Sequence, residues 1–183
     1  KKFVDEKYVT DKDNLIEKMN EWGYRDAYIV RDSIVQVDDK HVDLYIDIDQ
    51  GDKYYLRNIS WVGNTVYKYD ALNRTLQLKR GDVYNQKLLD KRLHQDDDAI
   101  ANQYYNNGYV FNRITPVETN VVGDSIDLEI RIIENKQAHL NRVNISGNDR
   151  VFDEVVRREI KTKPGDLFNR EAIMRSAREI MSM

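Results

Sequence analysis

The chain of 183 residues has the length of one or two ordinary domains. A third of its residues are charged and 40% are hydrophobic, which is typical of a folded chain and not of a disordered one. The net charge of -3 argues against nucleic-acid binding, which needs a concentrated basic face, and the lack of cysteine excludes disulfides and thiolate chemistry. Apolar runs are too short to span a membrane, and no signal peptide follows Lys1. We therefore interpret the chain as a segment of a longer protein.

The first part of the chain predicts a helix followed by two strands. The helix begins at about Thr10, a capping residue, and extends to Trp22 with its apolar residues on one face. Strands are predicted over 27–37 and 42–49, joined by a polar turn.

The middle of the chain predicts a strand, two helices and two further strands. The first strand covers 55–61 and is followed by a short helix over 69–78. A longer helix begins at Asn85, a plausible N-cap, and ends at Gly108.

Two strands, predicted over 109–119 and 125–133, complete the middle of the chain as a hairpin. In the second strand Ile126, Leu128 and Ile130 alternate with polar residues, which predicts one buried face. The remaining residues repeat the pattern as far as the second helix.

The sequence repeats itself with a period near 84 residues. Asp43-Leu44-Tyr45-Ile46 matches Asp127-Leu128-Glu129-Ile130, and the register continues through turns and helices. Glycines recur at matched corners, which implies matched backbone turns. The matched pairs are Gly23-Tyr24 with Gly108-Tyr109, Gly63-Asn64 with Gly147-Asn148, and Gly81-Asp82 with Gly165-Asp166.

Three local motifs, in this order and spacing, resemble POTRA repeats of BamA-like outer-membrane protein assembly factors. Ile59-Ser60-Trp61-Val62-Gly63-Asn64 is similar to the end of the first strand, Gly81-Asp82-Val83-Tyr84 to the turn before the second helix, and Gly108-Tyr109 to the start of the second strand. The resemblance implies an α+β fold of tandem POTRA-like repeats (β-α-α-β-β). Each repeat is expected to be a three-stranded mixed sheet covered by two helices on one face, with the first strand beside the third and the second strand at an edge.

The repeat divides the chain into three predicted parts. Residues 1–51 are the C-terminal half of one repeat, 52–135 are a complete repeat, and 136–183 are the N-terminal part of a further, truncated repeat. Val155-Val156-Arg157-Arg158-Glu159 looks like the repeat nearest the barrel, which suggests the third to fifth repeats of such a protein.

The resemblance also implies a location and partners. The chain is expected to be the periplasmic arm of an outer-membrane protein of a Gram-negative bacterium, continuing into an outer-membrane β-barrel. Its expected partners are unfolded outer-membrane proteins and accessory assembly lipoproteins, but no nucleic acid. Because both ends of the chain cut through a repeat, head-to-tail self-association of the segment is a further possibility, which a monomeric mass in light scattering would exclude.

No cluster of residues predicts catalysis. Asp96-Asp97-Asp98 is interpreted as a solvated helix face, because consecutive helical positions point about 100° apart and do not converge on one ion. His41, His94 and His139 lie in different elements without metal-ligand spacing. We predict no enzyme activity, no catalytic residue, no cofactor and no metal.

The candidate binding site is the outer strand of each hairpin, whose free backbone groups can accept another strand. In the middle repeat Pro116 is expected to end this edge. The candidate residues are Val110, Phe111, Asn112, Arg113, Ile114 and Thr115 in the middle repeat and Ala27, Tyr28, Ile29, Val30 and Arg31 in the first.

The predicted function is to bind unfolded outer-membrane proteins by β-augmentation and to scaffold accessory lipoproteins. Alternatives are the POTRA-like arm of a TamA-type or two-partner-secretion transporter, and an envelope scaffold that transfers no client. An enzyme with a polar cluster between repeats is a third alternative.

Overall fold

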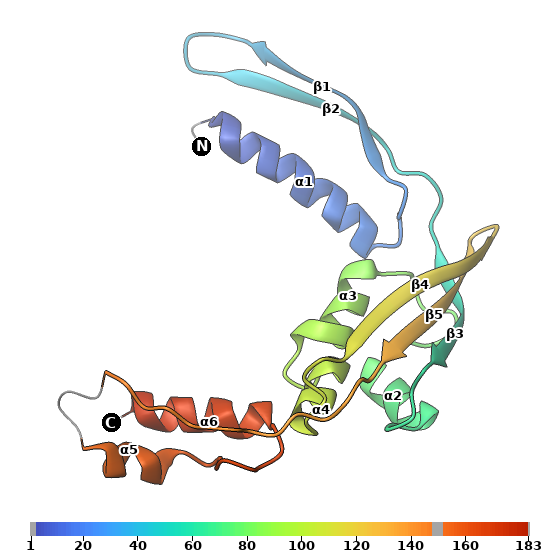
Figure 1. Cartoon of the computed structure of the whole chain (residues 1–183). Helices are drawn as coiled ribbons and strands as arrows, with labels where there is room; N and C mark the ends of the chain where they lie inside the picture. Colours follow the sequence, from blue (N-terminus) through green and yellow to red (C-terminus); the bar gives the residue numbers. More distant parts are fainter. Residues whose placement is uncertain (1–2, 148–151, 183) are drawn as a thin grey trace. The chain divides into compact units, whose positions relative to one another are not determined.

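The computed structural model describes residues 3–147 and 152–182 (Figure 1). The chain divides into two compact units, and both cut across the sequence repeat. The first unit comprises residues 1–60, 78–91 and 117–129, and the second comprises 61–77, 92–116 and 130–183.

The first repeat contributes one helix and one hairpin. Helix α1 (Asp5–Glu21) is followed by β1 (Tyr28–Gln36) and β2 (Val42–Asp49), which pair as an antiparallel two-stranded sheet. The prediction that Thr10 caps α1 is wrong. Thr10 lies one turn inside the helix, where its hydroxyl donates to the carbonyl of Glu6 (3.1 Å), so Asp5 and Glu6 are the acidic residues of the first turn.

The middle repeat carries most of the buried core. Its elements in chain order are β3 (Tyr55–Val62), α2 (Tyr69–Leu76), α3 (Gln86–Asp90), the π-helical turn η1 (Lys91–Gln95), α4 (Ile100–Asn106), β4 (Arg113–Val122) and β5 (Ser125–Ile133). The apolar residues that alternate along β5 are almost fully buried, whereas Arg131 and Ile133 are exposed. One face of this sheet is therefore the core face, as the alternation predicts.

The sheet of the middle repeat has the order β3-β5-β4. At its start, the amide of Tyr55 donates to the carbonyl of Asp124 (2.8 Å), and after its end Gly63 lies against the carbonyl of Ile132. Because residue numbers rise together along both strands, β3 and β5 are parallel, whereas the hairpin strands β4 and β5 are antiparallel. The sheet is therefore mixed, with the first strand beside the third and the second at an edge.

The predicted second helix is broken in two. Arg92 is 8% exposed and forms ion pairs with Asp96 (2.9 Å) and Asp98 (2.8 Å), while its Nε donates to the carbonyl of Thr75 at the end of α2 (3.0 Å). These bonds fold residues 96–99 into a turn between η1 and α4. The prediction that Asp96-Asp97-Asp98 lies on a helix face is therefore wrong, because these residues form a turn in which two carboxylates hold a buried guanidinium. Asp97 and Asp98 are exposed to solvent, as predicted.

The last part of the chain contains α5 (Asp153–Glu159) and α6 (Arg170–Met181). Residues 140–147 form no ladder with any described strand, and only an isolated bridge joins His139 to Leu167. Residues 148–151, which include part of the Gly147-Asn148 motif, lie outside the described chain.

The two junctions between repeats have the same backbone hydrogen bond. At the first junction the amide of Tyr54 donates to the carbonyl of Gly23 (2.9 Å), just after α1. At the second junction the amide of Ala138 donates to the carbonyl of Gly108 (2.8 Å), just after α4. Both glycines have positive φ, at 97° and 82°. The repeat in the sequence therefore includes the joint between repeats as well as the elements within each one.

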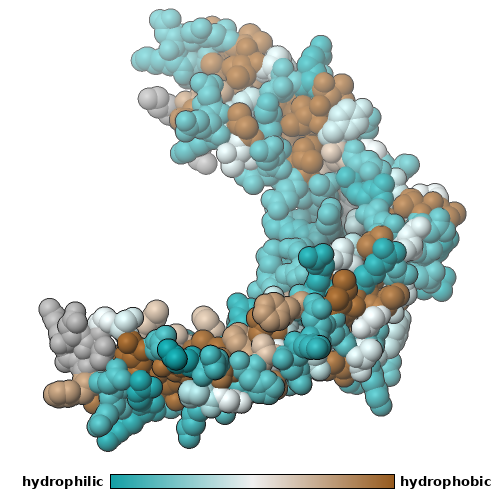
Figure 2. Space-filling view, viewed as in Figure 1, coloured by the Kyte–Doolittle hydropathy of each residue, from teal (hydrophilic) through white to brown (hydrophobic). Residues whose placement is uncertain are grey.

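The hairpin of the first repeat leaves its core stripe uncovered in the described chain. Val42, Leu44 and Ile48 of β2 are 37%, 45% and 37% exposed. Ile126 and Leu128, which lie 84 positions after Val42 and Leu44 in β5, are 0% and 1% exposed. Figure 2 shows hydrophobic side chains on the surface of the part that contains β1 and β2.

Candidate strand-binding edges

Strand β4 is an edge strand, because its only neighbour in the sheet is β5. The structure places Arg113, Ile114 and Thr115 at the start of this strand, as predicted. Within the described chain, the backbone of β4 forms no hydrogen bonds to other backbone groups except those that pair it with β5. An added strand could therefore pair with its outer side.

Residues 110–112 are not part of the edge, and their prediction as strand is wrong. The amide of Val110 donates to the carbonyl of Gly108 (2.9 Å), and the carbonyl of Phe111 accepts from the side chain of Asn135 (2.6 Å). Asn112 bonds to the carbonyl of Tyr109 through both its amide and its side chain. These bonds form the turn that leads into β4, so the backbone groups are already occupied.

The strand continues beyond Pro116, which was expected to end it. Pro116 lies inside β4 and lacks an amide hydrogen, but residues 117–122 extend the strand to the hairpin turn. This run contains no proline, lies within the first compact unit, and includes the exposed side chains of Val121 and Val122. The unbroken edge is therefore 117–122, which sequence reasoning missed although the Gly123-Asp124 turn marks its end.

One side chain of this edge is anchored to the preceding repeat. Glu118 accepts from Arg25 (2.6 Å), in the loop after α1, and from the hydroxyl of Tyr84 (2.7 Å). Burial, and then the nearby carboxylate of Glu118, raise the pKa of Tyr84, so the tyrosine stays a donor at neutral pH. This anchor fixes the side-chain position of Glu118.

Strand β1 provides the second predicted edge, but its pairing with β2 is irregular at its start. Ala27 is buried and precedes the strand, while Tyr28, Ile29, Val30 and Arg31 lie on it. The pairing with β2 shifts between Ile29 and Arg31, which marks a β-bulge at Val30. A bulge bends a strand and hinders the pairing of a further strand. Regular pairing runs from Arg31 to Gln36 instead.

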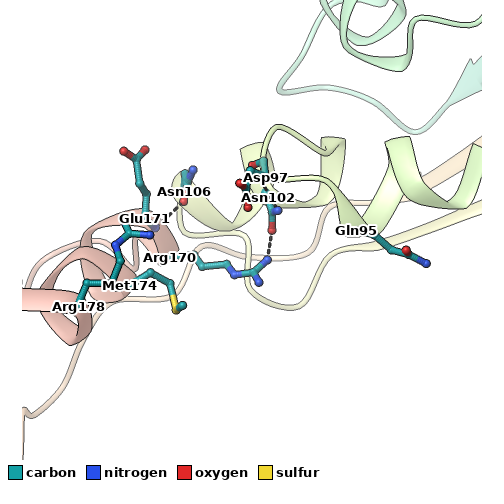
Figure 3. Close-up of a pocket in the computed structure, with 8 residues that line it drawn as sticks. All are labelled: Gln95, Asp97, Asn102, Asn106, Arg170, Glu171, Met174 and Arg178. Atoms are coloured by element: carbon teal, nitrogen blue, oxygen red, sulfur yellow. Dashed lines mark hydrogen bonds between the residues drawn. The ribbon is translucent and has the colours of Figure 1, made fainter. Parts of the chain in front are cut away.

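A polar pocket lies beside α4 and α6 in the second compact unit (Figure 3). Asn102, which is buried, accepts from Arg170, and the side chain of Asn106 accepts from the amide of Glu171 (2.9 Å). The pocket is lined by amides and by both signs of charge, with no serine, cysteine or histidine among its lining residues. The residues that form it come from two repeats and join them.

Within residues 3–147 and 152–182, no group of three histidine, aspartate or glutamate side chains lies where it could hold a metal ion. Among the described helices, none combines the length and the apolar character needed to cross a bilayer.

Comparison with known proteins gives the family. POTRA, described as a surface antigen variable number repeat, matches residues 54–135 and 138–183. The chain is 27% identical over 171 residues to a Treponema pallidum protein whose name describes an outer membrane protein assembly factor, a match that covers 89% of this chain and 20% of that protein. It is 25% identical over 176 residues to the outer membrane protein assembly factor BamA of Neisseria meningitidis, covering 87% and 22%.

The fold agrees with a solved member of this group. The crystal structure of BamA POTRA3-5 from Haemophilus influenzae matches with a TM-score of 0.73 at 18% identity, covering 96% of this chain and 68% of that one. The chain spans only about a fifth of the length of the two curated relatives. The family match covers more than half of the residues, and the chain therefore belongs to the POTRA family.

Proposed function

We propose that the chain is part of the periplasmic arm of a BamA-type assembly factor and that it receives unfolded outer-membrane proteins on the edge of β4. The observation that carries this proposal is the position of residues 117–122 at the open side of a three-stranded sheet. The names of the curated relatives support the assembly role and favour it over a scaffold that transfers no client. These relatives have the names of assembly factors and not of enzymes.

Main-chain pairing suits a client whose sequence varies. An incoming strand would form about four to six hydrogen bonds, each contributing about 0.5–1.5 kcal/mol net. Association costs at least about 4 kcal/mol, so a single edge binds weakly, with a Kd of about a millimolar. Weak binding allows the client to leave, and several repeats in series raise its effective concentration. The docking of accessory lipoproteins and the strand β1 as a second edge remain predictions.

The test is an NMR titration of the chain with a strand peptide from an outer-membrane β-barrel. We expect amide shifts concentrated at residues 117–122, since the amides of this run that face away from β5 would gain partners. Shifts that leave β4 unchanged would refute the mechanism while leaving the fold intact.

A matched pair of peptides tests the hydrogen bonds themselves. Methylating alternate backbone nitrogens removes the donors on one side of the peptide, because adjacent amides of a strand point in opposite directions. The peptide methylated on the side that faces β4 should lose binding, whereas the peptide methylated on the other side should retain it. Equal binding by both would show that side chains, rather than backbone groups, hold the client.

A further inference from the structure

Charged side chains connect the two repeats at the first junction. Lys87 of α3 forms ion pairs with Glu17 (3.1 Å) and Glu21 (2.9 Å) of α1, and Lys18 pairs with Glu21 (2.6 Å). The side chains of Lys87, Glu17 and Lys18 are about half exposed, at 53%, 49% and 59%, and Glu21 is 19% exposed. These pairs join two repeats within the first compact unit, and they lie in contact with solvent.

Neutral amides take this place at the second junction. The side chain of Asn106 accepts from the amide of Glu171 (2.9 Å), and its carbonyl accepts from the side chain of Asn169 (3.0 Å). Asn102 accepts from Arg170 and is buried (Figure 3). Each of these bonds has at least one neutral partner.

The difference lies at equivalent positions of the repeat. The equivalent pairs are Glu17 and Asn102, Glu21 and Asn106, and Lys87 and Glu171, at spacings of 84 or 85 residues. Two carboxylates of one junction are therefore two amides in the next, and the lysine that faces them is a glutamate. Since the backbone bond is the same at both junctions, only the side chains distinguish them.

Dissolved salt acts differently on these two kinds of bond. Electrostatic attraction between exposed charges is screened over about 30 Å at 0.01 M salt and about 3 Å at 1 M. A hydrogen bond with a neutral amide does not depend on attraction between two net charges, so salt screens it much less. The first junction should therefore weaken as salt rises, and the second should not.

We propose that the first junction is a hinge whose opening depends on ionic strength, whereas the second is a joint that salt leaves closed. This inference concerns the joints of the arm and does not depend on client binding. It gives neighbouring repeats of one arm different mobility under the same conditions.

Hydrogen exchange of two amides in the intact chain tests the proposal. The amides of Tyr54 and Ala138 donate across the first and second junctions respectively, so each reports the opening of its own joint. Raising sodium chloride from about 0.02 M to about 0.5 M should speed the exchange of Tyr54 about threefold relative to Ala138, as expected for exposed ion pairs. The amide of Ile130, in the core strand β5, serves as the control for global unfolding.

Reversing the charge of Lys87 should reverse the effect of salt on the exchange rate of the Tyr54 amide. In Lys87→Glu the three carboxylates repel, so exchange of Tyr54 should be faster at low salt, and added salt should now slow it. Reversing the opposite side as well, with Glu17→Lys and Glu21→Lys, should restore the original direction. These residues are at the surface, and an unchanged Ile130 exchange rate would show that the fold is intact.

Transfer of the ionic pair to the second junction completes the test. Asn106→Glu combined with Glu171→Lys should make the exchange of Ala138 depend on salt. The proposal is overturned if salt changes Tyr54 and Ala138 equally in the natural chain, or if Lys87→Glu leaves the salt response of Tyr54 unaltered.

Discussion

Arg92 is the residue that most shapes the middle repeat. Its guanidinium is buried, joins the end of α2 to the turn before α4, and neutralises two of three consecutive aspartates. Consecutive acidic residues usually indicate solvated surface, but here Asp96 and Asp98 reach one cation because both lie in the turn that follows η1. The sequence gives no local signal for this break, since it requires a partner, Thr75, from another helix.

We expect Arg92→Ala to destabilise the fold by about 2–3 kcal/mol, because several hydrogen bonds from a buried charged group are lost together. Urea denaturation followed by circular dichroism measures the change. Arg80→Ala, at an exposed position of the turn after α2, should change stability by less than about 0.5 kcal/mol. Similar losses in both variants would contradict the role given to Arg92.

Glu134 makes stability depend on pH. Burial raises the pKa of Glu134, but hydrogen bonds from the hydroxyl of Thr65, the amide of Val66 (3.0 Å) and the hydroxyl of Tyr104 (2.8 Å) outweigh it, so the pKa is lowered overall. A carboxyl whose pKa is lower in the folded state stabilises the fold above its unfolded pKa of about 4.3. That stabilisation is lost as pH falls through the folded value.

We therefore expect Glu134→Gln to reduce stability at pH 7 and to have a smaller effect near pH 3. Denaturation of both proteins across this range measures the difference. A difference that stays constant with pH would mean that the carboxylate does not stabilise through its charge.

Among the elements, the turn after each second helix acts as part of a joint. Gly108 has a φ of 82°, and an added Cβ would lie 2.6 Å from a methyl of Leu167, in the next repeat. Gly165 has a similar φ of 94° but no atom within 4 Å of an added Cβ. An alanine would therefore be strained at both positions, but it would be crowded by a neighbouring atom only at Gly108.

We expect Gly108→Ala to cost about 1–2 kcal/mol from strain, as Gly165→Ala does, and a further amount from the clash with Leu167. The excess should appear as greater loss of stability and as faster exchange of the Ala138 amide. If both variants behave alike, Gly108 is needed only for its backbone conformation.

The edge strands show what a sequence pattern can and cannot give. The repeat and the order of elements follow from alternating apolar residues and matched glycines, whereas the position of β4 at an edge is implied by the resemblance to POTRA repeats. The strand's start at Arg113 does not, because the preceding residues are equally compatible with a strand and are held in a turn by Asn135, a distant residue. The bulge at Val30 likewise depends on its pairing with β2, which local pattern does not encode.

At the scale of the whole molecule, the same apolar stripe is buried in one repeat and exposed in another. The core stripe of β2 is exposed in the described chain while its counterpart in β5 is buried. This stripe is an available surface for the head-to-tail self-association predicted from the sequence, which remains a prediction. The repeat boundaries at 51 and 135 also remain predictions, since the compact units of the structure cut across them.

The place of Pro116 within β4 has a consequence for any strand captured there. The uninterrupted edge covers residues 117–122, whereas a strand that crosses a membrane has about 9–11 residues. Under the proposed function, a captured strand would leave an overhang of about three to five residues beyond the edge. A second edge strand could begin to pair with this overhang while the first edge still binds the rest of the client. Transfer could then proceed by gradual strand displacement, without a fully detached intermediate.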